Sequence, residues 1–326
     1  MRICVFGAGA IGGHVAARLA KGGADVSVVA RGAHLAAMAE RGITVRAADG
    51  TFTVPVRASS DPAALGRQDA VIVTLKAPAL PVLPQAIGPL LGPDTPVAFV
   101  MNGVPWWYFL RHDGPLAGTR LPRLDPDGAI ERVIGVERTI GGTVYSACTV
   151  VEPGVIESTN QRSRVVLGEL DGSDTPRIRA IAAALEGGGM GGVVSPDIRS
   201  EVWLKWMGNI ANGPLAILTR SSLKDTYAEP ALRDAARALM REGKAIAHAL
   251  GAPIEVDEDA RMKATGASPH KPSILQDLEL GRPMEIDALF TVPMELGHKL
   301  GVKTPTLDLL SALGRQAARA AGLYAG

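Results

Sequence analysis

The stretch ICVFGAGAIGGHVAARLA, residues 3–20, decides the fold of this chain. Its first four residues are apolar and include β-branched and aromatic side chains, as is typical of a buried parallel strand, and residues 11–20 have a helical apolar period. Between them, Gly7, Gly9 and Gly12 form a GxGxxG pattern. The first glycine of such a turn permits the reversal, the second lets backbone N–H groups approach a pyrophosphate, and the third lets helix and strand pack closely.

We therefore interpret this turn as a dinucleotide-binding site, with the pyrophosphate at the positive end of the helix dipole. A Gly-rich turn without a ligand is the alternative, because 38 glycines in 326 residues produce chance matches. The position of the motif directly after the first strand favours the binding site. The residues predicted to contact the cofactor in this turn are Gly7, Ala8, Gly9, Ala10, Ile11 and Gly12.

Arg31 indicates which dinucleotide is bound. Residues 25–29 form a second apolar strand, and an NAD-binding site of this kind would end it with an acidic residue that holds the ribose 2′-hydroxyl. Here Arg31 stands at that place, and a guanidinium can pair with a 2′-phosphate that a carboxylate would repel. We therefore predict NADP(H). A solvated loop arginine is the alternative interpretation.

The composition excludes several classes of partner. The net charge of +1 gives no support to a nucleic-acid groove or a basic membrane-binding face, so we expect a small-molecule substrate and neither nucleic acid nor membrane as a partner. Cys4 and Cys148 are too few for a disulfide framework or a zinc site and indicate a reducing compartment. The first strand leaves no room for a signal peptide, and no run of 18 apolar residues is present. We expect a cytoplasmic protein.

The chain changes character near residue 195. Alternating strand and helix signals over residues 1–195 predict a Rossmann-type, doubly wound α/β domain that binds NADP, including a hairpin at Asp49-Gly50, a helix over 80–91 and a strand over 132–136. Residues 196–326 predict a mostly α-helical substrate and catalytic domain. Its predicted helices are 201–216, 230–250, 257–263, 273–279, 285–300 and 306–321. Helical second domains often supply dimer contacts, so a homodimer stays open as the oligomeric state.

Several side chains that could do chemistry come directly after predicted strands or share a helix face. Lys76 comes after the strand DAVIVTL and Asn102 comes after PVAFVM, so both are expected at the edge of the sheet that faces the cofactor. Lys205 and Asn209 project from one face of an otherwise apolar helix. A lysine in such surroundings can serve as a general acid. The ordinary alternative is a lysine whose stem packs on the helix and whose ammonium reaches solvent.

The sequence resembles the ketopantoate reductase family along nearly its whole length. Besides the glycine turn and Arg31, the blocks that carry the resemblance are VTLKA (73–77), MNGV (101–104), EVWLKWMGN (201–209) and SILQDLELGRPMEID (273–287). The resemblance implies NADPH-dependent reduction of a 2-keto acid, in the best-known case ketopantoate to pantoate on the way to coenzyme A through pantothenate.

The resemblance also implies roles for single residues. Lys205 would be the general acid, and Asn102 and Glu285 would complete the catalytic set, with Asn102 also near the cofactor. The predicted substrate-binding residues are Asn209, Asn212, Ser273 and Lys76, of which Lys76 would also lie near the cofactor. No metal is expected, since the six histidines show no ligand spacing and carboxylates two residues apart, such as Glu285 and Asp287, do not face each other on a helix.

Two departures from the family pattern bear on the substrate. Gly213 stands where a second helix asparagine is expected, with Asn212 one residue earlier, which moves an amide by about 100° around the helix. The bulky insert PWWYF, residues 105–109, is the other departure. Either could adapt the pocket to another 2-keto or hydroxy acid, so a paralogous reductase is the first alternative. A non-catalytic NADP(H)-binding regulator is the second.

Overall fold

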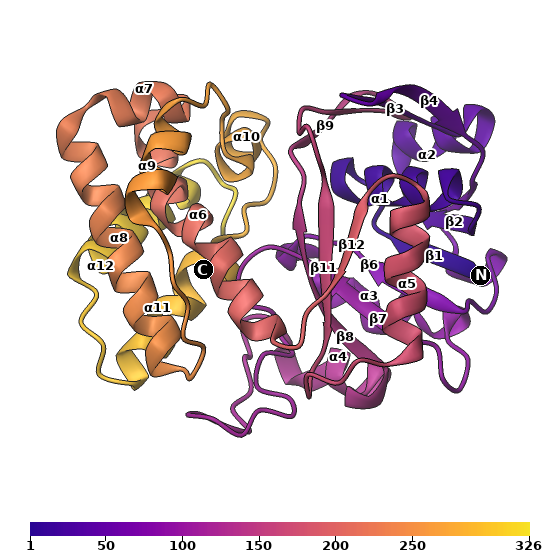
Figure 1. Ribbon diagram of the computed structural model, residues 1–326, viewed down its shortest axis with the longest axis horizontal. Coiled ribbons are helices and arrows are strands. Elements are labelled where there is room, and N and C mark those ends of the chain that lie inside the picture. The colour runs from indigo at the N-terminus through magenta and orange to yellow at the C-terminus, as the bar shows by residue number, and fades with distance from the viewer. The chain divides into compact units, whose positions relative to one another are not determined.

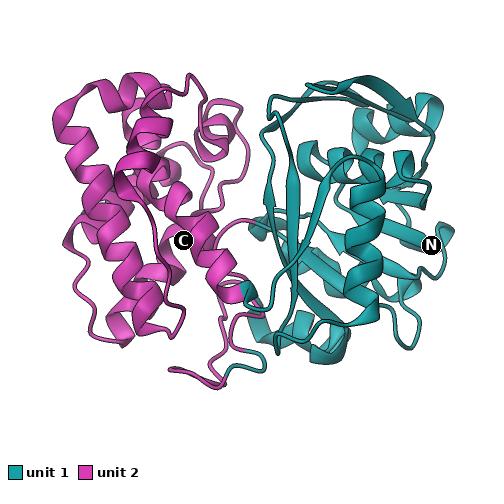
Figure 2. Ribbon diagram, in the orientation of Figure 1, with its two compact units in different colours: residues 1–101, 110–112, 125–198 teal, residues 102–109, 113–124, 199–326 magenta.

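The computed structural model describes residues 1–326 and divides into two compact units (Figure 2). The first, here the sheet unit, comprises Met1–Met101, Leu110–His112 and Asp125–Ile198. The second, here the helical unit, comprises Asn102–Phe109, Asp113–Leu124 and Arg199–Gly326. All residues after Ile198 belong to the helical unit, so the last boundary lies three residues beyond the expected one. Two short segments between residues 102 and 124 also belong to the helical unit.

The sheet unit is built on a Rossmann-type sheet of eight strands in the order β12-β11-β8-β7-β6-β1-β2-β5 (Figure 1). All neighbours are parallel except β8 and β11. The strand order reverses at β1, which is where such sheets bind nucleotides. The strands are β1 (Arg2–Phe6), β2 (Asp25–Val29), β5 (Arg57–Ser59), β6 (Ala70–Val73), β7 (Val97–Val100), β8 (Thr139–Tyr145), β11 (Arg164–Glu169) and β12 (Gly191–Val194).

Aliphatic packing holds this sheet to its helices. Helices α1 (Ala10–Lys21) and α5 (Pro176–Gly187) contact each other, and α1 also contacts β1 and β2. The core that they share includes Ile3, Val5, Val15, Leu19, Val28, Ile178, Ile181 and Leu185, all of which are fully buried. Each such side chain contributes about 1.5–3 kcal/mol of burial free energy.

A second sheet of four strands, in the order β4-β3-β10-β9, contacts α1. Its strands are β3 (Ile43–Ala47), β4 (Gly50–Val54), β9 (Cys148–Glu152) and β10 (Val155–Ser158), and helix α2 (Gly32–Arg41) precedes β3. The predicted hairpin at Asp49-Gly50 is confirmed, with Gly50 at φ +115°. The β9–β10 hairpin belongs to this second sheet, because β10 pairs in parallel with β3.

A polar cluster in which His14 and Arg18 are buried and Asp49 is exposed fixes α1 to the second sheet. Arg18 donates to both carboxylate oxygens of Asp49, at 2.6 and 2.7 Å, and its Nε donates to Nε2 of His14 at 3.1 Å. Burial lowers the pKa of His14 to about 4, so the ring is neutral and its Nδ1–H faces Ser146 Oγ at 3.0 Å. Burial also raises the pKa of the neighbouring Cys148 thiol. The cluster therefore has a structural role and no activated thiolate.

Two segments of the sheet unit differ from the sequence prediction. The helix expected over residues 80–91 is replaced by short turns, η2 (Ala77–Val82), α3 (Leu83–Ala86) and η3 (Gly88–Leu90), because the prolines at positions 78, 81, 84 and 89 cannot sustain a helical ladder. The strand expected over residues 132–136 is wrong. Residues 129–134 form helix α4 (Ala129–Ile134), since the buried carboxylate of Asp125 accepts hydrogen bonds from the N–H groups of Ile130 and Glu131. The remaining short turns are η1 (Pro62–Ala64), η4 (Pro126–Gly128) and η5 (Val136–Arg138).

The helical unit contains α6 (Ile198–Thr219), α7 (Leu223–Ala228), α8 (Pro230–Ala249), α9 (Glu258–Gly266), α10 (Ser273–Glu279), α11 (Val292–Lys299) and α12 (Pro305–Ala320). One π-helical turn, Asp287–Thr291, precedes α11 and is called the π turn below. Helix α8 contacts α7, α9, α11 and α12. No helix of the structure combines the length and the hydropathy needed to cross a membrane.

The aromatic insert, residues 105–109, lies in the core of the helical unit. The indole Nε1 of Trp203 donates to the hydroxyl of Tyr108 at 2.7 Å, and the two rings meet edge to face. Nε of Arg199 donates to the backbone carbonyl of Tyr108 at 2.9 Å. The insert therefore supports the first half of α6 by packing.

Candidate active site

The glycine turn of the sheet unit has the geometry that a pyrophosphate requires. Gly7 has φ +102°, a backbone conformation that other residues avoid. A Cβ at Gly12 would overlap the carbonyl of Gly7 and the hydroxyl of Thr74, so the third glycine is needed for close packing. A Cβ at Gly9 would meet no atom within 4 Å, so a ligand can approach the backbone there.

The start of α1 completes this cradle. The helix begins at Ala10, so the N–H groups of its first turn have no intrahelical acceptor. Its first turn carries no acidic side chain and its N-cap residue, Gly9, has no side chain that could accept from them. The residues from Gly7 to Gly12 thus fit an anionic group such as a dinucleotide pyrophosphate.

Arg31 and Lys76 lie beyond the carboxyl ends of the strands on either side of β1. Phe6 at the end of β1 pairs with Val29 of β2 and with Val73 of β6. Arg31 comes two residues after Val29, at the N-cap of α2, and Lys76 comes three residues after Val73. Both side chains are exposed. Two cations therefore come after the strands that flank the glycine turn, as the sequence predicts.

The remaining predicted site residues belong to the helical unit. Lys205 and Asn209 lie four residues apart on α6, and Gly213 comes next at the same spacing, so the three positions share one face. The side-chain Nδ2 of Asn209 is buried and has no hydrogen-bond partner in the structure. A buried donor left without an acceptor costs about 1–3 kcal/mol, which makes Asn209 a candidate for a ligand contact.

The π turn connects the three elements that carry the candidate catalytic residues. The carbonyl of Ala288 accepts a hydrogen bond from the N–H of Val104 at 2.9 Å, two residues after Asn102. The carbonyl of Leu289 accepts from Nε1 of Trp206 at 2.7 Å, the residue after Lys205. Glu285, which is 4% exposed, lies two residues before the turn. The segments that carry Asn102, Lys205 and Glu285 are therefore connected through one piece of backbone.

Gly103 is required for the contact between the Asn102 loop and the π turn. It has φ +78°, and a Cβ at this position would overlap the carbonyl of Ala288. Asp287 has other partners, since it accepts from the hydroxyl of Tyr324 at 2.7 Å and from Arg123 at 3.5 Å. Of the two carboxylates, Asp287 is thus engaged in packing the turn.

Asn212 is engaged by the protein. Its Oδ1 accepts a hydrogen bond from the hydroxyl of Tyr227 at 2.6 Å, and Tyr227 belongs to a buried cluster with Ala211 and Leu215. This geometry favours a structural role for Asn212 over the predicted substrate contact.

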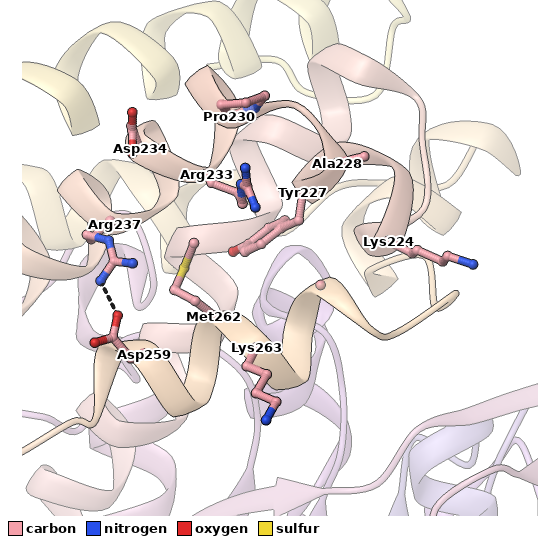
Figure 3. Close-up of a pocket in the computed structure, with 11 residues that line it drawn as sticks. Lys224, Tyr227, Ala228, Pro230, Arg233, Asp234, Arg237, Asp259, Met262 and Lys263 are labelled. Atoms are coloured by element: carbon pink, nitrogen blue, oxygen red, sulfur yellow. Dashed lines mark hydrogen bonds and ion pairs between the residues drawn. The ribbon is translucent and has the colours of Figure 1, made fainter.

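Tyr227 also lines a cavity of about 580 Å³ among α7, α8 and α9 (Figure 3). Arg237 at its rim is paired with Asp259 at 2.7 Å. The cavity is lined by Lys224, Tyr227, Ala228, Pro230, Arg233, Asp234, Arg237, Asp259, Met262, Lys263 and Gly266, and it therefore contains none of the candidate site residues.

The loop before α10 carries His270, which the sequence analysis did not identify as a site residue, close to the predicted substrate residue Ser273. Ser273 is the first residue of α10 and is exposed. Three residues earlier, desolvation of the ring and then the positive charge of Lys205 lower the pKa of His270. Its position just before the Ser273 block was the available sequence signal.

Family models match most of the chain. The model described as "Ketopantoate reductase PanE/ApbA" matches residues 3–172, and that described as "Ketopantoate reductase PanE/ApbA C terminal" matches residues 197–318. A curated protein of Mesorhizobium japonicum named 2-dehydropantoate 2-reductase is 44% identical over 326 residues, which is 99% of this chain and 100% of that one.

Solved structures agree with this likeness. A 2-dehydropantoate 2-reductase from Geobacter metallireducens superposes with a TM-score of 0.85 at 31% identity, over 97% of this chain and 100% of that chain. A D-mandelate dehydrogenase bound to NADH and anilino(oxo)acetate has a TM-score of 0.81 at 21% identity, over 99% and 100% of the two chains, and shares the fold.

Gly103→Ala is predicted to destabilise the helical unit by about 2–4 kcal/mol, because a left-handed backbone and overlap with the Ala288 carbonyl act together. Urea unfolding followed by tryptophan fluorescence measures this, since all four tryptophans lie in the helical unit. The control is Gly281→Ala, which has φ +63° and open space around its Cβ and should cost about 1 kcal/mol. Equal losses for the two variants would contradict the close contact.

Proposed function

The chain belongs to the ketopantoate reductase family, and from that premise we propose that it reduces a 2-keto acid with NADPH, with ketopantoate, which would yield pantoate, as the first substrate to test. The observation that supports this most is that the segments carrying Asn102, Lys205 and Glu285 meet at one π turn, through the hydrogen bonds of Val104 and Trp206. An ammonium, an amide and a carboxylate held together are the groups that carbonyl reduction needs.

Lys205 is the proposed general acid. When bound, the reduced nicotinamide supplies a hydride to the carbonyl carbon of the substrate, and negative charge develops on the carbonyl oxygen. The ammonium of Lys205 stabilises that charge and transfers its proton to the oxygen, so the product is a 2-hydroxy acid and the lysine regains a proton from solvent.

The neighbouring groups orient the substrate in this proposal. Glu285 accepts a hydrogen bond from a substrate hydroxyl or from Lys205, and Asn102 orients the carbonyl or the cofactor. The orphaned Nδ2 of Asn209 donates to the substrate, and Ser273 donates to its carboxylate. A carboxylate without donors in a closed site would cost several kcal/mol, so at least one such contact is required.

The sheet unit holds the cofactor in this proposal. The glycine turn holds the pyrophosphate, and Arg31 pairs with the 2′-phosphate that distinguishes NADPH from NADH. Lys76 lies beside the same turn and contributes positive charge. We also propose a cytoplasmic location, which suits an enzyme with two unpaired cysteines.

Lys205→Ala is expected to lower kcat for NADPH-dependent reduction of ketopantoate by about 10²–10⁴-fold, since the proton donor is lost. The dissociation constant for NADPH should stay unchanged, because Lys205 is not among the proposed cofactor contacts. Lys244→Ala is the control, since this lysine of α8 pairs with Glu255 at 2.6 Å and has no proposed role in the reaction. Turnover of Lys205→Ala within a few-fold of the parent would exclude the acid role and favour a non-catalytic NADP(H)-binding regulator.

Arg31→Asp is predicted to weaken NADPH binding by at least about tenfold and to leave NADH binding nearly unchanged, because only NADPH carries the 2′-phosphate. Titration of each cofactor by protein fluorescence gives the two dissociation constants. Arg41→Asp, at the other end of α2, controls for the change in net charge. An equal effect of Arg31→Asp on both cofactors would remove the case for NADP specificity.

A contact on α6 supports the paralogous reductase as a second candidate function. A Cβ at Gly213 would lie 2.8 Å from Cζ of Phe290 and 3.6 Å from Cγ2 of Ile274. The face that carries Lys205 and Asn209 therefore ends in hydrocarbon where an amide is expected. Such a pocket suits a 2-keto acid with a hydrocarbon side chain.

Ketopantoate and 3,3-dimethyl-2-oxobutanoate test this candidate, because they differ by one hydroxyl. If the paralogous function holds, the two kcat/KM values lie within about 10²-fold of each other, since an apolar pocket discriminates weakly against an added or missing hydroxyl. A site with a polar partner for that hydroxyl would reject the deoxy acid by about 10⁴-fold or more. A preference of that size for ketopantoate would exclude the paralogue.

A further inference from the structure

The backbone ladder changes register directly after Glu285. The N–H of Leu289 bonds the carbonyl of Glu285, four residues back, as in an α-helix, whereas the N–H of Val292 bonds the carbonyl of Asp287, five residues back. In a regular helix, the N–H of Val292 would bond the carbonyl of Ala288, and the N–H of residue 293 would bond the carbonyl of Leu289. Residue 293 is proline, which has no N–H. Pro293 therefore cannot bond the carbonyl of Ala288, five residues back, or that of Leu289, four residues back.

Both carbonyls find donors on other elements. Ala288 is fully buried and Leu289 is 3% exposed, so water does not replace the missing bonds. Val104 N–H bonds the first carbonyl, and Nε1 of the fully buried Trp206 bonds the second at 2.7 Å. The donors come from the two segments that carry Asn102 and Lys205.

We propose that the π turn sets the catalytic geometry, with Trp206 as a positioning residue and Pro293 as the residue that maintains the turn. This rests on the proposed function. An inserted residue rotates the preceding part of a helix by about 100° relative to the succeeding part, so the turn fixes the direction of Glu285 relative to α11. The hydrogen bond from the Trp206 indole to the Leu289 carbonyl fixes the position of α6 along its axis, and hence the position of Lys205 relative to the Glu285 carboxylate.

A π turn that only packs the unit and a π turn that positions the catalytic groups would respond differently to substitution. If the turn only packs the unit, restoring a regular helix should leave activity in step with stability. If it positions the reacting groups, a regular helix should keep the stability and lose the rate, because a displacement of about 1 Å in such a site can cost about 10²-fold.

Pro293→Ala supplies an N–H at position 293 that competes with Trp206 for the Leu289 carbonyl. We expect an unchanged or higher Tm, and a kcat about 10- to 100-fold lower with an unchanged dissociation constant for NADPH. Pro305→Ala, at the first position of α12, is the matched control and should leave kcat unchanged.

Trp206→Phe removes the donor and keeps an aromatic ring. We expect lower Tm and lower kcat, whereas Trp203→Phe, which removes the indole bond to Tyr108, should lower Tm alone. In the double variant W206F/P293A the new N–H satisfies the carbonyl, so Tm should recover and kcat should not. If Pro293→Ala does not fold, the comparison of Trp206→Phe with Trp203→Phe decides.

The two levels of proposal fail separately. If none of the 2-keto acids tested supports NADPH oxidation by the wild-type protein, the proposed function is overturned. A wild-type protein that turns over, with a kcat that changes in step with Tm in every one of these variants, overturns the positioning role of the π turn and leaves the function standing.

Discussion

The carbonyl of Leu289 cannot receive the usual helical bond from the residue four positions later, because that residue is Pro293, and a side chain from another helix bonds it instead. A buried carbonyl without a partner costs about 1–3 kcal/mol. The indole of Trp206 removes this cost, and Val104 does the same for Ala288. Segments that are about 80 and 180 residues away in sequence are thereby fixed to one backbone turn.

In the sheet unit, backbone groups at a helix end are left without partners in the protein, which is the opposite of the arrangement at the π turn. At the start of α1, donors without intrahelical acceptors are kept for a ligand, and Gly9 leaves space for it to approach. At the π turn, two carbonyls that Pro293 cannot bond are bonded by other segments of the chain. The first arrangement suits a binding site, whereas the second suits a rigid support, which the proposed proton donor Lys205 would require.

The range of an interaction along the chain decides whether the sequence could predict it. The glycine turn, the Asp49-Gly50 hairpin and the helix of Lys205 are encoded within a few residues, and the structure has all three. The strand predicted over residues 132–136 is absent, because the hydrogen bonds that start helix α4 come from Asp125 upstream of that segment. The π turn needs a donor from Trp206, about 80 residues earlier, and no local pattern encodes that partner.

The π turn also connects positioning with substrate selection. Phe290 is a residue of the turn, and its ring occupies the space that a side chain at position 213 would need. An amide at 213 therefore requires Phe290 to move, and moving Phe290 disturbs the turn that supports Lys205 through Trp206. Gly213 is then the residue that is compatible with this turn, and the apolar end of the site is a consequence of how its catalytic groups are held.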